Sequence, residues 1–241
     1  MDVTSPLFWF ALGQIIVADL LLAGDNAVVI ALAARSLPPD KQKKAIMIGA
    51  LAAVAMRVAL TVVAAQLLTL PLLKLVGAVL LFYIAVSLVV PSKNGGADAH
   101  SDKPAASTMF QAVRTILIAD VVMSVDNVIA VAAAARGDTF LLILGLLISI
   151  PLVVYGSTLL LRLIERFPII IWGGAALLGF VAGELLVTDP FVLDWMREFS
   201  ESVGVASGII KVIAGLIGGI LVLLLASAML RRRQRGTAAA G

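Results

Sequence analysis

Seven long apolar runs constrain the fold of this chain more than any other feature of its sequence. Each is close to the ~20 residues with which an α-helix spans a bilayer. They lie at residues 7–33, 45–68, 70–90, 110–135, 139–163, 168–188 and 208–230. Only helices and closed barrels satisfy the backbone in lipid, and these runs are continuous rather than alternating. The sequence therefore predicts an all-α polytopic membrane protein with seven transmembrane helices.

The distribution of Lys and Arg predicts how these helices are oriented. If the N-terminus lies outside, thirteen of the 18 basic residues fall on the cytoplasmic side, and only Lys74, Arg136 and Arg197 fall on the other side. The positive-inside rule thus favours an outside N-terminus and an inside C-terminus. The arginines at 231–235 fit a topology anchor against anionic headgroups, so the expected partner is the bilayer and not a nucleic acid.

One polar motif occurs twice within these apolar runs. Ala18-Asp19, five residues and Asp25-Asn26 reappear 101 positions later as Ala119-Asp120, five residues and Asp126-Asn127. Over residues 18–35 and 119–136, eight of eighteen positions are identical at this offset. Such a match indicates an internal duplication.

The third and sixth runs support the duplication, because residues 77–85 and 174–182 share a pattern of small and apolar residues. Three spans per copy would place the two copies in opposite orientations, which is an architecture of many transporters. The predicted organisation is a first three-helix repeat (1–90), a cytoplasmic linker (91–109), a second, inverted three-helix repeat (110–188), an extracytoplasmic loop (189–207), and a seventh helix with a basic tail (208–241).

The acids of the motif are costly in these surroundings. A carboxylate at the bilayer centre costs roughly 2.5–3.5 kcal/mol on insertion scales, so these side chains should face a polar interior and meet cations or protons. Carboxylate and amide oxygens suit hard divalent ions such as Mg²⁺, Ca²⁺ and Mn²⁺. The chain has no cysteine, and its single histidine, His100, falls in the linker. We therefore predict a transport site for a divalent metal ion at Asp19, Asp25, Asn26, Asp120, Asp126 and Asn127.

Four further residues are candidates for supporting roles. Glu184 is an acid within the sixth run, while Ser124 and Met123 precede the second Asp-Asn pair. The Met123 thioether is a soft ligand that would prefer Mn²⁺ to Mg²⁺. Arg57, within the second run, offers a structural alternative, namely an ion pair with Asp19 or Asp120.

Two arrangements of the motif remain open. In one, Asp19 and Asp120 form a central site near the midplane, and Asp25 and Asp126 guard the two entrances. In the other, the helices unwind at residues 24–26 and 124–127 and bring the Asp-Asn pairs inward with free carbonyls as extra ligands. Gly24 and the length of the first run favour the second arrangement, whereas Val125 in place of glycine weakens it.

The doubled Asp-Asn motifs, with the trailing Ala-x-Ala-Ala-Arg, resemble the TerC family of integral membrane proteins, which belongs with the LysE-type exporters. The resemblance covers the chain from the first run to the seventh. It implies a manganese exporter of the bacterial cytoplasmic membrane that uses the six motif residues. Protons are the candidate exchange ion, because an empty buried acid tends to take up a proton.

Other functions predict other observations. An exporter of small organic cations or amino acids would bind an ammonium group with the same acids and a carboxylate with Arg57. A non-transporting partner in a resistance complex would show no flux by itself. No nucleotide-binding motif and no nucleophile–base set is present, so neither ATP coupling nor an enzymatic activity is expected, and no cofactor is implied.

Overall fold

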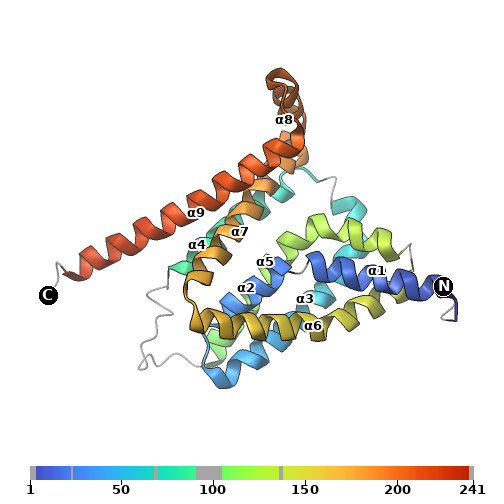
Figure 1. Ribbon diagram of the computed structural model, residues 1–241, viewed down its shortest axis with the longest axis horizontal. Helices are drawn as coiled ribbons and strands as arrows, with labels where there is room; N and C mark the ends of the chain where they lie inside the picture. The colour runs from blue at the N-terminus through green and yellow to red at the C-terminus, as the bar shows by residue number, and fades with distance from the viewer. Residues whose placement is uncertain (1–3, 23, 68–69, 91–104, 136–137, 239–241) are drawn as a thin grey trace. The chain divides into compact units, whose positions relative to one another are not determined.

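The computed structural model describes residues 4–22, 24–67, 70–90, 105–135 and 138–238 (Figure 1). All regular structure in these ranges is helical, as predicted. The helices in chain order are α1 (Pro6–Leu22), α2 (Gly24–Ala34), α3 (Pro39–Leu67), α4 (Leu73–Val89), α5 (Ala105–Ala135), α6 (Thr139–Arg166), α7 (Ile169–Thr188), α8 (Pro190–Val203) and α9 (Ser207–Ala238). The predicted linker at 91–109 falls outside the described residues up to position 104, and α5 begins at Ala105.

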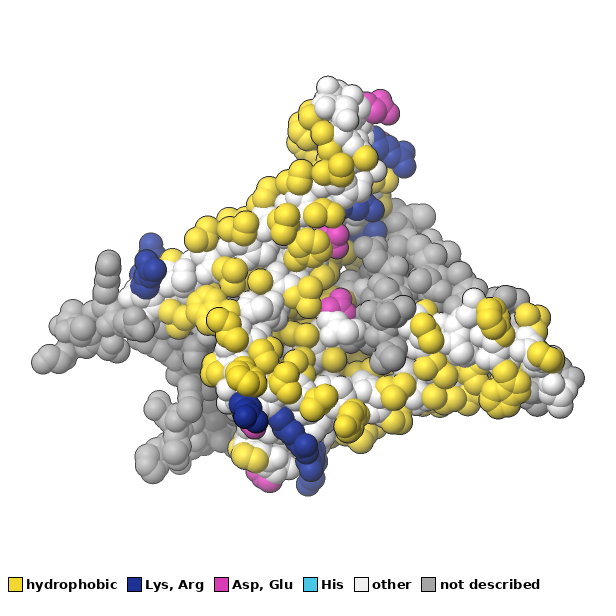
Figure 2. All heavy atoms as spheres, in the orientation of Figure 1, with side chains coloured by type: hydrophobic (Ala, Val, Ile, Leu, Met, Phe, Trp, Pro, Cys, Tyr) yellow, Lys and Arg dark blue, Asp and Glu magenta, His cyan; other side chains and the backbone are white. Residues whose placement is uncertain are grey.

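Four helical segments in the described ranges are long and apolar enough to cross a membrane. They are Pro39–Thr61, Thr139–Arg166, Ile169–Thr188 and Ser207–Arg232, and the bent pair α1–α2 would make a fifth. Figure 2 shows hydrophobic side chains over much of the visible surface, and α9 exposes a series of them that includes Leu216, Ile220 and Leu224. Such faces suit contact with lipid tails. The chain is an integral membrane protein, and the count of seven spans remains a prediction.

Helices α1, α2, α3, α5 and α6 form one compact unit. Its apolar core includes Phe8, Leu12 and Ile15 of α1, which pack against Leu142 and Leu146 of α6. The unit thus combines the first two spans of each predicted repeat. The repeat itself remains a prediction.

Helices α4, α7, α8 and α9 form the other compact unit, in which α7 packs against both α4 and α9. Glycines let α7 and α9 approach backbone to backbone. A Cβ atom on Gly179 would lie 2.7 Å from the carbonyl oxygen of Gly218, and one on Gly183 would overlap the carbonyl oxygen of Ala214. Small residues at membrane helix interfaces commonly allow such close packing.

Gly183→Ala is therefore expected to destabilise the protein by about 1–3 kcal/mol, the usual range for overpacking. The added methyl would meet backbone atoms, which cannot rotate away. Gly173→Ala, in the same helix, is the matched control, because a Cβ there meets nothing within 4 Å. Thermal unfolding in detergent measures both variants. Equal melting temperatures would contradict the close packing of α7 and α9.

Most of the predicted loop at 189–207 is instead the helix α8, which is a correction to the sequence analysis. Phe191, Trp195 and Phe199 recur every four residues on its exposed surface, and the rings of Trp195 and Phe199 stack at 6.1 Å. Acidic residues lie between them, so the segment is amphipathic rather than irregular. The charge of the segment suggested a loop, while the aromatic spacing indicated the helix.

Asp189 fixes the start of α8 and also the start of α4. Its carboxylate accepts backbone N–H groups from Phe191 at 2.8 Å and from Leu72 and Leu75 at 3.0 Å each. Leu72 has a left-handed backbone with φ of 68°, which this contact helps to hold. Burial opposes ionisation, but the backbone donors together outweigh it and lower the pKa of the Asp189 carboxyl. The negative charge of this residue therefore has a structural role.

Candidate functional site

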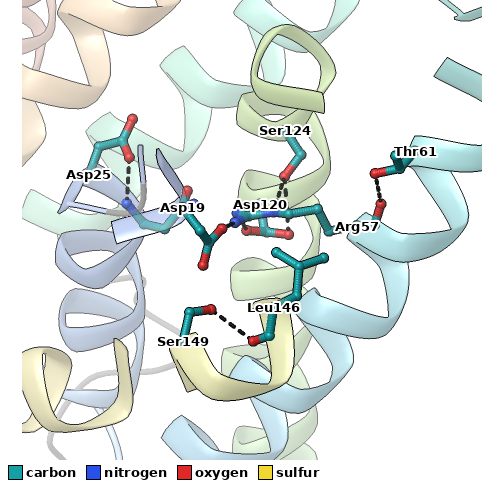
Figure 3. Close-up of polar contacts among 9 residues, drawn as sticks. Asp19, Asp25, Arg57, Thr61, Asp120, Ser124, Leu146 and Ser149 are labelled. Carbon is teal, nitrogen blue, oxygen red and sulfur yellow. Dashed lines mark hydrogen bonds and ion pairs between the residues drawn. The ribbon is translucent and has the colours of Figure 1, made fainter. Parts of the chain in front are cut away.

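Two of the predicted acids meet at one arginine inside the first unit (Figure 3). Arg57, in α3, donates from Nη1 to Oδ1 of Asp19 in α1, and from Nη2 to Oδ1 of Asp120 in α5 at 2.7 Å. Its Nε donates to the hydroxyl of Ser124 at 3.2 Å. The guanidinium thus joins three helices through three different nitrogens.

Helix periodicity explains why α5 supplies two of these partners. Ser124 follows Asp120 by four residues, so both side chains lie on one face of the helix. The Ser124 hydroxyl also lies 3.4 Å from Oδ2 of Asp120, to which it can donate. In α3, the Thr61 hydroxyl donates to the backbone carbonyl of Arg57 at 2.7 Å, which occupies the hydroxyl within its own helix.

The charges of this cluster do not balance. Asp19, Arg57 and Asp120 expose only 1%, 4% and 5% of their surfaces. Two carboxylates share one guanidinium, so the cluster carries a net charge of −1 when all three groups are ionised. Buried charges normally require full pairing, because removing each ion from water costs several kcal/mol. The cluster therefore attracts further positive charge.

A cavity of about 20 Å³ lies beside the cluster. Its polar wall consists of Asp19, Asn26, Arg57 and Asp120, and its apolar wall comes from α2, α3 and α6. A cavity needs about 10–15 Å³ to hold one water molecule, so this one admits a water or a cation of similar size. All five helices of the unit contribute to it.

The Asn26 side chain is the polar group in this cavity that lacks a partner. It is 4% exposed, and neither its amide nitrogen nor its amide oxygen makes a hydrogen bond. An unpaired buried amide costs roughly 1–3 kcal/mol, so it persists where another requirement maintains it. A ligand in the cavity would give the amide oxygen a partner.

The break in the first apolar run lies next to this site. Helix α1 ends at Leu22 and α2 begins at Gly24, and the axes of Pro6–Asp19 and Gly24–Ala34 differ by 49°. The last four carbonyls of a helix lack intrahelical partners, and such ends coordinate cations in membrane transporters. The bend precedes the expected residues 24–26, which are themselves helical as the first turn of α2, so the expected unwinding of these residues is wrong.

The corresponding break in the second copy is absent. Helix α5 runs without interruption from Ala105 to Ala135, through the whole segment 124–127. The expectation that both helices unwind is wrong for this one. Val125 stands where the first copy has Gly24, and valine lacks the backbone freedom of glycine. The two copies of the motif thus differ in backbone structure.

The other predicted site residues lie apart from the cluster or outside the description. Asp25 is partly buried, and its carboxylate accepts the backbone N–H of Asn26 at 2.8 Å (Figure 3). Met123 is buried in α5 but is not part of the cavity wall, and Glu184 belongs to α7 in the other unit. The side chains of Asp126 and Asn127 fall outside the described residues, so their role remains a prediction.

Among the described residues, no three Asp, Glu, His or Cys side chains gather closely enough to hold a metal ion. In this structure the cation that pairs with both Asp19 and Asp120 is the guanidinium of Arg57. The alternative of one ion pair thus understated the role of Arg57, which binds both acids.

Sequence reasoning did not identify the contribution of α6 to the site. Ile150 and Val153 line the cavity on either side of Pro151, a proline within the helix. Proline in a transmembrane helix frees a backbone carbonyl, and it was the available signal that this helix borders a polar site.

Comparison with known proteins identifies relatives along most of the chain. The model of the family described as integral membrane protein TerC matches residues 4–235. The uncharacterized membrane protein YjbE of Bacillus subtilis is 42% identical over 171 residues, which are 71% of this chain and 76% of that protein. YceF of the same organism, also described as an uncharacterized membrane protein, is 25% identical over 74% of this chain and 71% of its own. The inner membrane protein YgdQ of Escherichia coli is 23% identical over 68% and 74%. No solved structure matches.

Proposed function

The chain belongs to the integral membrane protein TerC family, and from this premise we propose that it is a secondary transporter that exports divalent metal ions, Mn²⁺ foremost, across the cytoplasmic membrane. The main support for the proposal is a single cavity whose wall includes two buried carboxylates and the Asn26 amide, which has no hydrogen-bond partner. Asp19 and Asn26 lie in the bent pair α1–α2, which has the length and composition of a membrane span. Ionisable residues in such places commonly mark ion pathways.

The chemistry of the cavity favours a metal ion over an organic substrate. Carboxylate and amide oxygens are ligands for hard divalent cations. Asp126 and Asn127 would complete the ligand set from the second copy of the motif. Protons are the proposed exchange ion, because acids that release a metal ion in an apolar site tend to bind a proton.

Two observations weigh against the export of amino acids. The space of about 20 Å³ suits a single small ion. Moreover, Arg57 directs all three of its donor nitrogens at Asp19, Asp120 and Ser124, so it is not free to anchor a substrate carboxylate. An organic substrate would require a larger cavity as well as a released guanidinium, whereas a small metal ion would not need the larger cavity.

Flux assays in proteoliposomes test the proposal. We expect the purified protein to carry Mn²⁺ faster than Mg²⁺ or Ca²⁺, and Asp25→Asn to reduce this flux at least about tenfold, because it removes a charge inside an ion pathway. The asparagine oxygen can still accept the N–H of Asn26, so the local structure is retained. Asp194→Asn is the control, since that carboxylate lies on α8 with its side chain 90% exposed.

Three outcomes would contradict the proposal. Flux no greater than that of protein-free vesicles would favour a non-transporting partner. Inhibition of Mn²⁺ flux by unlabelled amino acids, with uptake of the amino acid itself, would favour the organic exporter. Equal flux in Asp25→Asn and the wild type would remove Asp25 from the pathway.

A further inference from the structure

We propose that Arg57 is a resident cation, which occupies the position between Asp19 and Asp120 in the empty transporter and which the incoming metal ion displaces. The inference rests on the proposed function and extends it, because it states what the site holds between transport cycles. Its basis is that Arg57 contacts both acids at once with separate nitrogens.

The first step of the argument concerns the empty site. A carrier that binds a divalent ion with buried acids must also exist without the ion. Two unpaired carboxylates in a buried site would each cost several kcal/mol. A guanidinium with its donors in a rigid fork can neutralise one charge while bonding to both carboxylates. Arg57 therefore stabilises the form without substrate.

The second step concerns competition. Arg57 donates to one oxygen of each acid, Oδ1 of Asp19 and Oδ1 of Asp120. A metal ion that takes ligands from both acids needs this same place, so the guanidinium must withdraw when the ion binds. Two cations that exclude each other weaken each other's binding, and the return of Arg57 promotes release of the ion.

The third step identifies what is left for the ion. The cluster retains a net charge of −1 with Arg57 in place. In the adjacent cavity, the Asn26 amide still has no hydrogen-bond partner. A cation can therefore first enter beside Arg57 and then replace it. Such an exchange needs no moment at which both carboxylates are bare.

Removal of the resident cation should change affinity and rate in opposite directions. In Arg57→Gln the metal ion no longer competes with a bound charge. We expect the Mn²⁺ concentration for half-maximal flux to fall at least about tenfold, as close charge pairs have coupling energies of that size or larger. The maximal flux should fall at least about tenfold as well, because release loses its competitor. A purely structural arginine would reduce the amount of folded protein without lowering the half-saturating concentration.

The experiment measures Mn²⁺ binding and flux for the wild type, Arg57→Gln and two controls. Arg57→Gln is purified with Mn²⁺ present, so that the ion replaces the lost charge during folding. Arg57→Lys keeps the positive charge and should stay within about threefold of the wild-type affinity. Arg162→Gln makes the same change at an exposed position of α6 and should match the wild type.

The results separate this inference from the proposed function. Tighter binding and slower flux in Arg57→Gln alone would support Arg57 as the resident cation. Unchanged or weaker binding in folded Arg57→Gln, or equal tightening in Arg57→Lys, would overturn it while wild-type flux remained intact. A wild type that neither binds nor carries any divalent ion would overturn the proposed function instead, and this inference with it.

Discussion

Asn26→Leu is expected to make the protein more stable and inactive. The Asn26 amide is 4% exposed and has no hydrogen-bond partner on either polar atom. Leucine has a similar size and no polar atoms, so the replacement removes a desolvation cost of about 1–3 kcal/mol. The same change removes a ligand from the cavity wall, and metal flux should fall to the level of protein-free vesicles. A gain in stability together with a complete loss of flux would identify a residue maintained for function.

Ser157→Ala provides the matched control for this variant. The Ser157 hydroxyl is also buried without a partner, and it lies in α6 of the same unit but is not part of the cavity wall. We expect a small gain in stability there with normal flux. Thermal unfolding in detergent and Mn²⁺ flux in vesicles measure both variants. A destabilised Asn26→Leu would show that the amide has a bonded structural role, and normal flux in it would exclude Asn26 from the site.

The repeated motif predicted the acids of the site but not the way in which they are paired. Hydropathy and spacing place Asp19 and Asp120 at similar depths of two helices, and both are buried together. Their common partner depends on the rotation and register of α3 against α1 and α5, which a single sequence does not reveal. Arg57 was therefore predicted as a supporting residue or as the partner of one acid, although it contacts both.

The backbone conformation was predicted best at positions where the identity of one residue largely determines it. Gly24 indicated a bend in the first run, which lies just before it although residues 24–26 are helical, and Val125 was the reason to doubt a break in the second copy, where α5 has none. The segment after Asp189 was predicted poorly because acidic composition outweighed the spacing of its aromatic residues. The number of spans was predicted less directly than the helices themselves, because hydropathy measures the length of an apolar run and not whether the run crosses the bilayer.

The charge count of the cluster leads to an unusual order of stabilities. Asp19→Asn leaves a neutral pair of Arg57 and Asp120, so the folded protein should lose no more than about 1 kcal/mol, the typical value of one hydrogen bond. The double variant with Asp120→Asn leaves a buried guanidinium without a counter-charge, which costs about 3–5 kcal/mol. The second substitution should thus cost far more than the first. With Asp120→Asn measured alone as well, denaturation in detergent would detect this as a coupling energy of at least about 1 kcal/mol.

Adding Arg57→Met to the double variant completes the test, because it removes the charge that the other two changes leave unpaired. Replacing a whole buried ion-pair cluster by neutral groups of similar size is often neutral or stabilising. We therefore expect the triple variant to recover the stability lost by the double variant, yet to carry no metal ion. If the three changes were simply additive, the two acids and the arginine would not act as one electrostatic unit. Recovered stability without flux would instead mean that the fold tolerates the loss of all three charges, and that transport is what requires them inside the membrane.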